Sequence, residues 1–189
     1  LKNVRLQKKL VLSALFAALI CVGSFIQIPL PGGIPIVLQD MMAMLSGLLL
    51  GPLFGALAVA IFLILGAIGF RVYSGKAGFH VLLNGPTSGF LWGYLAAAFL
   101  GGLFLALVLS QKKQSSVAAQ WIFITLAALI ATVTVFACGV AGGILVARLP
   151  LSKAIAAYVL PFIPGNLVKL VLMVLLTKKF RPVIYSYVN

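Results

Sequence analysis

The sequence predicts an all-α integral membrane protein with six transmembrane helices. Of its 189 residues, 63% are apolar and only 8% are charged, whereas a soluble domain is about 45–50% apolar and about 25% charged. The mean hydropathy is +1.25, and the apolar residues gather in stretches that are long enough to cross a bilayer. The net charge of +13 does not indicate nucleic-acid binding, because the basic residues stand at the ends of apolar stretches rather than in one patch.

Six apolar stretches form one membrane domain, with no separate soluble domain. They comprise residues 10–28, 36–50, 54–70, 86–109, 121–146 and 165–177. The second and third are short, since at about 1.5 Å per residue they fall short of a hydrocarbon core of ~30 Å. A Gly51-Pro52 turn lies between them, so we expect a tight helical hairpin. Pro86 suits the start of the fourth helix, and His80, the only histidine, is expected in a polar loop before it.

The last apolar stretch contains a lysine. Pro161, Pro164 and Gly165 precede it, so we expect irregular backbone up to about Pro164 and helix from about Asn166. Lys169 then falls in the first helical turn, where unpaired backbone N–H groups and the helix dipole add to its charge. Because a charge at depth in a bilayer costs a few kcal/mol or more, we interpret this arrangement as a pocket for an anion or a strong acceptor. The alternative is that Lys169 extends to the membrane interface without a binding role.

The distribution of basic residues predicts the orientation of the chain. Six spans place both termini on one side, and if that side is the cytoplasm, nine Lys and Arg residues lie inside and four outside. Cytoplasmic loops carry such an excess, so both termini are expected in the cytoplasm. Asp40, near the start of the second span, and Lys169 then face the external side.

Small residues recur at four-residue intervals on two spans. They are Ala14 and Ala18 on the first span, and Gly89, Gly93, Ala97 and Gly101 on the fourth. Such stripes let helices approach closely in lipid, and internal packing is their usual meaning. The stripe on the first span is the better candidate for docking another protein, because a first helix is often peripheral.

The inventory of ionisable side chains excludes most catalytic functions. Asp40 is the only acidic residue, so paired carboxylates for acid–base catalysis are impossible. The sequence has no Gly-x4-Gly-Lys-Ser/Thr phosphate loop and no metal-ligand cluster. We therefore expect no enzymatic activity, no cofactor or metal, and no ATP hydrolysis by this chain. Cys21 and Cys138 are expected to pack as small apolar residues, and Asp40 either caps its span or pairs with Lys169.

The polar groups near the expected external mouth form a candidate binding site. Its polar and backbone members are Gln39, Asp40, Asn84, Gly85, Thr87, Asn166 and Lys169. Apolar walls could come from five aromatic residues, namely Tyr73, Phe79, Phe90, Trp92 and Tyr158. Tyrosine and tryptophan also gather at membrane interfaces without a ligand, so that interpretation stays open for each aromatic residue.

Four motifs, spread in order over nearly the whole chain, resemble those of one family. Residues 83–91, Leu-Asn-Gly-Pro-Thr-Ser-Gly-Phe-Leu, resemble the Gly-Pro-Thr-Gly-Gly-Tyr-Leu signature of the BioY family, the biotin-specific S components of energy-coupling-factor (ECF) vitamin transporters. Residues 34–39 and 46–52 are similar to its second-span pattern, and residues 162–169 are similar to its last-span motif. Residues 14–18 resemble the Ala-x3-Ala element with which S components dock.

The resemblance implies a six-helix S component, in a bacterial plasma membrane, that captures biotin from outside. It also implies partners: a transmembrane coupling protein, which would dock on Ala14 and Ala18, and two ATPases that hydrolyse the ATP. The S component would then topple in the membrane to release the vitamin inside.

The sequence departs from the family pattern at three positions. Ser88 and Phe90 replace Gly and Tyr of the signature, and Asn166 replaces the Asp of a Pro-Gly-Asp-x-x-Lys motif. Biotin offers a neutral urea and a carboxylate, and Asn166 can still donate and accept hydrogen bonds. Lys169 lacks its charged neighbour, so it either stays protonated with help from Asp40 or attracts the ligand through long-range charge. Two other functions stay open: an S component for another small vitamin, and a membrane assembly protein with a vestigial pocket.

Overall fold

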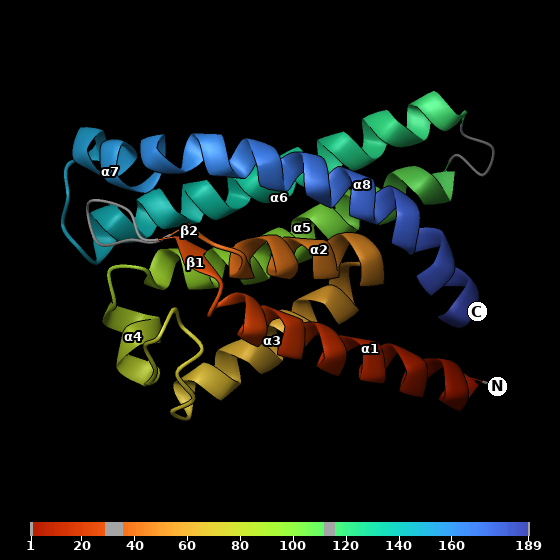
Figure 1. Ribbon diagram of the computed structural model, residues 1–189, viewed down its shortest axis with the longest axis horizontal. Coiled ribbons are helices and arrows are strands. Elements are labelled where there is room, and N and C mark those ends of the chain that lie inside the picture. Colours follow the sequence, from red (N-terminus) through yellow and green to blue (C-terminus); the bar gives the residue numbers. More distant parts are fainter. Residues whose placement is uncertain (1, 29–35, 112–115, 189) are drawn as a thin grey trace.

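The computed structural model describes residues 2–28, 36–111 and 116–188, and helices dominate it (Figure 1). In chain order the elements are α1 (Lys2–Gly23), β1 (Gln27–Ile28), β2 (Ile36–Val37), α2 (Gln39–Leu50), α3 (Pro52–Ala67), α4 (Phe79–Asn84), α5 (Ser88–Gln111), α6 (Val117–Leu145), α7 (Leu151–Tyr158), the 3-10 turn η1 (Leu160–Phe162) and α8 (Ile163–Val188). The two strands form a short antiparallel pair with Gln27 opposite Val37. The expected helical membrane architecture is confirmed.

Within the described part of the chain, four helical segments are long and apolar enough to cross a membrane. They are Asn3–Gly23, Ser88–Leu109, Val117–Leu145 and Leu151–Val188, and α2 and α3 are shorter apolar helices. The start of α1 and the end of α8 lie at the same end of the bundle (Figure 1), as an even number of spans requires. The count of six spans and the cytoplasmic position of the termini stay predictions.

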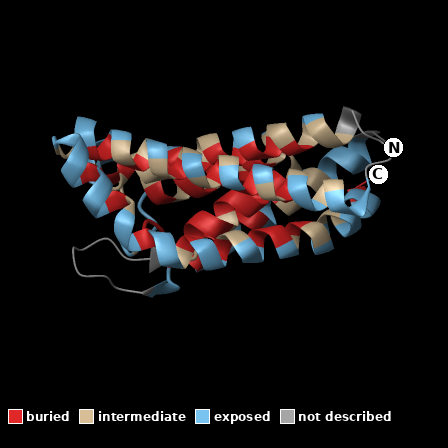
Figure 2. Cartoon of the chain, turned by 90° about the horizontal axis from the view of Figure 1, so that it is seen from above, coloured by how far each residue is buried: buried red, intermediate tan, exposed pale blue. Residues whose placement is uncertain are grey.

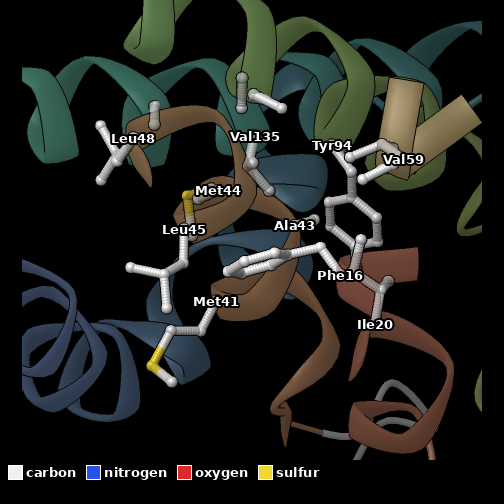
Figure 3. Packing of buried hydrophobic residues seen from close by; sticks show 14 of the residues in the cluster. Phe16, Ile20, Met41, Ala43, Met44, Leu45, Leu48, Val59, Tyr94 and Val135 are labelled. Carbon is white, nitrogen blue, oxygen red and sulfur yellow. The ribbon is translucent and has the colours of Figure 1, made fainter. Parts of the chain in front are cut away.

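Helix α2 is the central helix of the bundle. Nearly all of its residues are buried, and Met44, Leu45 and Leu48 pack among apolar side chains of the surrounding helices (Figure 3). The outer faces of the long helices are exposed (Figure 2), and many large apolar side chains lie there. A helix that is apolar on all sides is typical of a membrane span, so these outer faces are suited to contact with lipid.

Glycines bring α2 into close contact with α3 and α5. The hairpin between α2 and α3 turns at Gly51, whose φ of +84° is one that other residues rarely adopt. A Cβ atom on Gly55 of α3 would lie 2.4 Å from the Cα atom of Gly47, and one on Gly47 would lie 2.0 Å from the carbonyl oxygen of Ala98 on α5. The tight hairpin expected from the sequence is therefore present, and α2 lies between α3 and α5.

The two small-residue stripes have different surroundings. A Cβ atom on Gly89 would lie 2.3 Å from the carbonyl oxygen of Cys138 on α6, and one on Gly93 would lie 2.9 Å from the Cβ atom of the same cysteine. The stripe on α5 therefore packs against α6, as its usual meaning predicts. Ala14 and Ala18 on α1 are exposed, and their use in docking stays a prediction.

The helices extend beyond the apolar stretches that were used to predict them. Helix α1 begins at Lys2 rather than at residue 10, and α8 continues to Val188 rather than ending near residue 177. Lysine, arginine and glutamine are good helix formers, so a helix continues past the apolar part of its sequence. At the other end of α1 the helix stops at Gly23, and residues 27–28 belong to a strand.

Short helices occupy the segment around His80 that was expected to be a polar loop and the segment between the fifth and sixth predicted spans. Helix α4 contains His80 and Asn84, and α7 contains Lys153. Pro86 precedes α5, which begins at Ser88, so its expected place at the helix start is wrong. Helices of six and eight residues are too short to show a clear hydrophobic period.

Candidate functional site

A buried ion pair joins the last helix to the central one. The Nζ atom of Lys169 on α8 lies 2.7 Å from Oδ1 and 2.9 Å from Oδ2 of Asp40 on α2. The same ammonium donates to the backbone carbonyl of Val37 at 2.5 Å, so acceptors surround it. Lys169 is 6% exposed and Asp40 is 8% exposed. The lysine therefore points into the protein, and the alternative in which it extends to the membrane interface does not hold.

Helix α2 holds the carboxylate of Asp40 in place. Asp40 lies in the first turn of the helix, where the positive end of the helix dipole stabilises an anion. Its Oδ1 atom also accepts a hydrogen bond from the backbone N–H of Met41 at 2.8 Å. Of the two roles considered for Asp40, pairing with Lys169 is confirmed.

Lys169 lies deeper in its helix than the sequence predicts. Helix α8 begins at Ile163, directly after the 3-10 turn, and Pro164 takes the second helical position, where a missing N–H costs nothing. Lys169 therefore falls in the second turn, and the expected place in the first turn is wrong. The free N–H groups of the helix start do not surround the ammonium, and its charge is balanced by Asp40 instead.

The ion pair lies at the wall of a cavity of about 110 Å³. The cavity is lined by Val37, Gln39, Asp40, Tyr73, Ser74, Lys76, Thr87, Phe90, Leu91, Tyr94, Val135, Phe136, Phe162, Asn166 and Lys169. These residues come from β2, the start of α2, the loop after α3, Thr87 and the first turns of α5, the middle of α6, η1 and the start of α8. They lie at the end of the bundle opposite the start of α1 and the end of α8 (Figure 1).

Five of the seven predicted polar and backbone members line this cavity, namely Gln39, Asp40, Thr87, Asn166 and Lys169, and so does the predicted aromatic residue Phe90. Aromatic residues line the same cavity. The Nδ2 atom of Asn166 donates to the carbonyl of Phe162 at 3.0 Å, which leaves its Oδ1 atom as an acceptor. The structure therefore gathers polar groups from α2, from Thr87 just before α5 and from α8 at one place.

Asn84, Gly85 and Tyr158 were also predicted as binding residues, and they do not line the cavity. Asn84 is the exposed last residue of α4, and Gly85 ends that helix with its N–H donating to the carbonyl of Val81 at 3.2 Å. Tyr158 is buried behind the wall, with its ring centroid 5.6 Å from that of Phe90. The first two shape the approach to α5, and Tyr158 supports Phe90.

The predicted aromatic walls are confirmed for some residues and not for others. Tyr73 and Phe90 line the cavity, whereas Phe79 is 61% exposed and Trp92 is 46% exposed. The indole N–H of Trp92 donates to the carbonyl of Leu82 at 3.1 Å, which anchors α4 to α5.

A two-residue turn next to Tyr73 brings two further polar groups to the cavity. Tyr73 and Lys76 exchange backbone hydrogen bonds of 3.0 Å, and Ser74 and Gly75 between them have φ of +50° and +84°, as in tight hairpin turns. The Tyr73 hydroxyl donates to the carbonyl of Leu63, and burial raises the pKa of this phenol to about 12. This anchored turn brings Ser74 and Lys76 to the cavity wall.

Sequence reasoning missed several lining residues. Tyr94 follows Phe90 by one helical turn, so the four-residue spacing could have identified it. Val135 and Phe136 lie in the middle of α6, where nothing distinguishes them from other apolar residues of the span. They reach the cavity only because the glycines of α5 bring α6 close.

Gln39 carries an acceptor without a partner. The side chain is 1% exposed, it lines the cavity, and its Oε1 atom makes no hydrogen bond to any described residue. A buried acceptor without a hydrogen bond is costly. A ligand with an N–H donor would remove that cost.

The sequence of the chain is similar to those of known proteins over nearly its whole length. The sequence model of the BioY family matches residues 2–186. The chain belongs to the BioY family. A relative named biotin transporter BioY from Thermotoga maritima is 35% identical over 92% of this chain and 96% of its own length. Another of the same name from Rhodobacter capsulatus is 38% identical over 94% and 96%.

A solved structure extends the likeness from sequence to fold. A crystal structure at 2.1 Å of the S-component for biotin from an ECF-type ABC transporter matches this BioY chain with a TM-score of 0.83 and 30% identity. The match covers 96% of this chain and 95% of the other. The predicted family and the S-component fold are therefore confirmed.

Proposed function

We propose that this chain is the S component of an ECF-type transporter and that the cavity beside Lys169 binds biotin. The biotin-transporting relatives support this function. The observation that carries it for this chain is the polar wall of the cavity, which combines the ion-paired ammonium of Lys169 with the unpartnered acceptor of Gln39. A suitable ligand offers both N–H donors and acceptor oxygens, as the urea and carboxylate of biotin do.

Each part of biotin finds a matching group in the cavity. The urea N–H groups need acceptors, and Gln39 and Asn166 each offer an amide oxygen. Its carbonyl oxygen and its carboxylate need donors, and Lys169 can serve either of them. Phe90, Tyr94 and the other apolar lining residues suit the fused ring and the aliphatic chain, because small-molecule sites are mostly apolar with a few placed polar groups.

Asp40 balances the charge of Lys169 until the ligand arrives. The ammonium has three protons, and it faces three acceptor atoms: the Val37 carbonyl and both carboxylate oxygens of Asp40. A bound acceptor takes one of these donors, and Asp40 retains the others. In this proposal Asp40 compensates for Asn166, which leaves the last-span motif without its carboxylate.

The proposal assigns energy coupling to partners. The chain is a multi-pass membrane protein with exposed small residues on α1, and Ala14 and Ala18 would let a helix of a coupling protein approach closely. Two ATPase subunits would supply ATP hydrolysis, after which the S component topples to release biotin. With both termini in the cytoplasm of a bacterium, the cavity opens to the outside of the plasma membrane.

A vitamin panel tests the proposal. Purified protein should be stabilised against thermal unfolding by biotin at micromolar or lower concentrations, and not by riboflavin or thiamine. Stabilisation by another vitamin instead would indicate an S component of different specificity, which the Asn166 substitution keeps open. No stabilisation by any of them would favour a membrane assembly protein.

A further inference from the structure

A second cavity, of about 230 Å³, lies where the start of α1 and the end of α8 meet the α2–α3 turn. Its lining comprises Lys9, Leu12, Leu49, Leu50, Gly51, Ala106, Arg181, Ile184, Tyr185 and Val188. This is the end of the bundle opposite the candidate biotin site (Figure 1). The cavity is therefore separate from that site.

Two cations line this cavity, and no carboxylate side chain can balance them. They are Lys9 on α1 and Arg181 on α8. The only acidic residue of the sequence is Asp40, which is bound to Lys169 at the other end. The Nη1 atom of Arg181 is buried and has no hydrogen-bond partner among the described residues. A buried charge is stable only when an opposite charge or several hydrogen bonds compensate it.

The rest of the lining is mostly apolar and is held in place. Leu12, Leu49, Leu50 and Ile184 form much of the wall. Beside it, the ammonium of Lys8 donates to the carbonyl of Tyr187 at 2.7 Å, which ties α1 to the last turns of α8. The cavity thus combines two positive charges with an apolar wall, and a hydrogen bond between α1 and α8 lies beside it.

We propose that this cavity binds a phosphate group through Arg181 and Lys9. The planar guanidinium group matches the oxygens of a phosphate, and lysine adds a compact positive charge. The phosphate can belong to the headgroup of an anionic phospholipid, whose glycerol and first methylene groups would contact the leucines, or it can be free phosphate. The end of the bundle that is predicted to face the cytoplasm is rich in cations, and anionic lipids are attracted to such segments.

The test measures saturable stabilisation of the full-length chain in neutral detergent. One series adds phosphatidylglycerol, a second adds phosphatidylcholine, and a third adds inorganic phosphate. Phosphatidylglycerol should raise the unfolding midpoint, and Arg181→Gln and Lys9→Gln should each weaken its apparent affinity at least about fivefold. Arg5→Gln is the matched control, because Arg5 is an exposed cation on α1 that does not line the cavity. Ala106→Leu narrows the cavity without removing charge and should also weaken binding of phosphatidylglycerol. This variant tests the proposal if Arg181→Gln does not fold.

The three series also separate the sources of the phosphate. A response to phosphatidylglycerol alone assigns the site to a lipid headgroup, and an equal response to inorganic phosphate assigns it to the free ion. Equal weakening by Arg5→Gln, an equal response to phosphatidylcholine, or no saturable response would overturn the proposal. An Arg181→Gln defect seen only when a coupling protein is bound would overturn it as well, in favour of an acidic protein partner.

Discussion

Lys169 and Asp40 stand 129 positions apart in the sequence, and the Nζ atom of the lysine lies 2.7 Å from the nearer carboxylate oxygen of the aspartate. This contact pairs the only carboxylate side chain of the sequence with a lysine inside the last apolar helix. It fastens α8 to α2 at the wall of the candidate site, so it should matter both for stability and for binding.

Removal of the carboxylate should destabilise the protein strongly. Asp40→Asn leaves a buried ammonium without its counter-ion, and losing one partner of such a pair costs about 3–5 kcal/mol. Lys169→Met in the same chain removes that ammonium, so the double variant should unfold at a higher midpoint than Asp40→Asn alone. The measurement is the midpoint of thermal unfolding without ligand for both single variants and the double variant. Strictly additive effects of the two substitutions would show that the side chains are not coupled.

Gln39→Met should weaken biotin binding without destabilising the ligand-free protein. The Oε1 atom makes no hydrogen bond to described residues in the ligand-free structure, and methionine keeps a similar volume. A neutral hydrogen bond to ligand contributes about 1 kcal/mol, so affinity measured by calorimetry should fall about fivefold. Asn84→Ala is the control, because Asn84 is exposed and lies outside the cavity lining. If Asn84→Ala weakened biotin binding more than Gln39→Met does, the binding site would have to lie elsewhere than in this cavity.

A methyl group on Gly47 should disturb the whole bundle. The added Cβ atom would lie 2.0 Å from the backbone oxygen of Ala98, and backbone cannot move aside without shifting α5. Overpacking of this kind costs about 1–3 kcal/mol, seen as a lower unfolding midpoint of Gly47→Ala. Ala14→Val, on the exposed face of α1, adds more volume and should leave the midpoint within error. Equal midpoints for both variants would contradict the close approach of α2 and α5.

Larger side chains on the exposed face of α1 should block assembly but not ligand binding. Ala14→Leu with Ala18→Leu would keep a coupling protein's helix from approaching closely, so the variant should fail to co-purify with that protein and the ATPases. Its affinity for biotin should not change, because neither alanine lines the cavity. Ala156→Leu on the exposed face of α7 is the control. Normal co-purification of the double variant would remove this face from the interface.

The fold class and much of the site could be predicted from the sequence because they depend on composition and local pattern. Apolar length identified the spans, and the glycine spacing on α5 identified its packing face. A lysine within an apolar stretch and the only acidic residue of the chain were each unusual enough to identify the two halves of the ion pair. Gln39 and Thr87 were predicted from their place among the polar groups near the expected external mouth, and both also lie within family motifs.

Other features depend on contacts between distant segments, and no local pattern reports them. The helix start at Ile163 follows from the 3-10 turn before it, and it moved Lys169 out of the first turn. Val135 lines the cavity because α5 and α6 pack closely. Asn84 belongs to a conspicuous motif, yet its position at the end of α4 turns it to the surface.

The affinity of Lys169→Ala for biotin tests the central claim most directly. Among the described residues, Lys169 is the only cation buried at the candidate site. Titration calorimetry should therefore show binding weakened at least about tenfold, or roughly 1.4 kcal/mol. Lys153→Ala removes an exposed cation on α7 and should bind as the unmodified chain does. Biotin affinity that is the same in Lys169→Ala and in the unmodified chain would contradict the assignment of this cavity as the binding site.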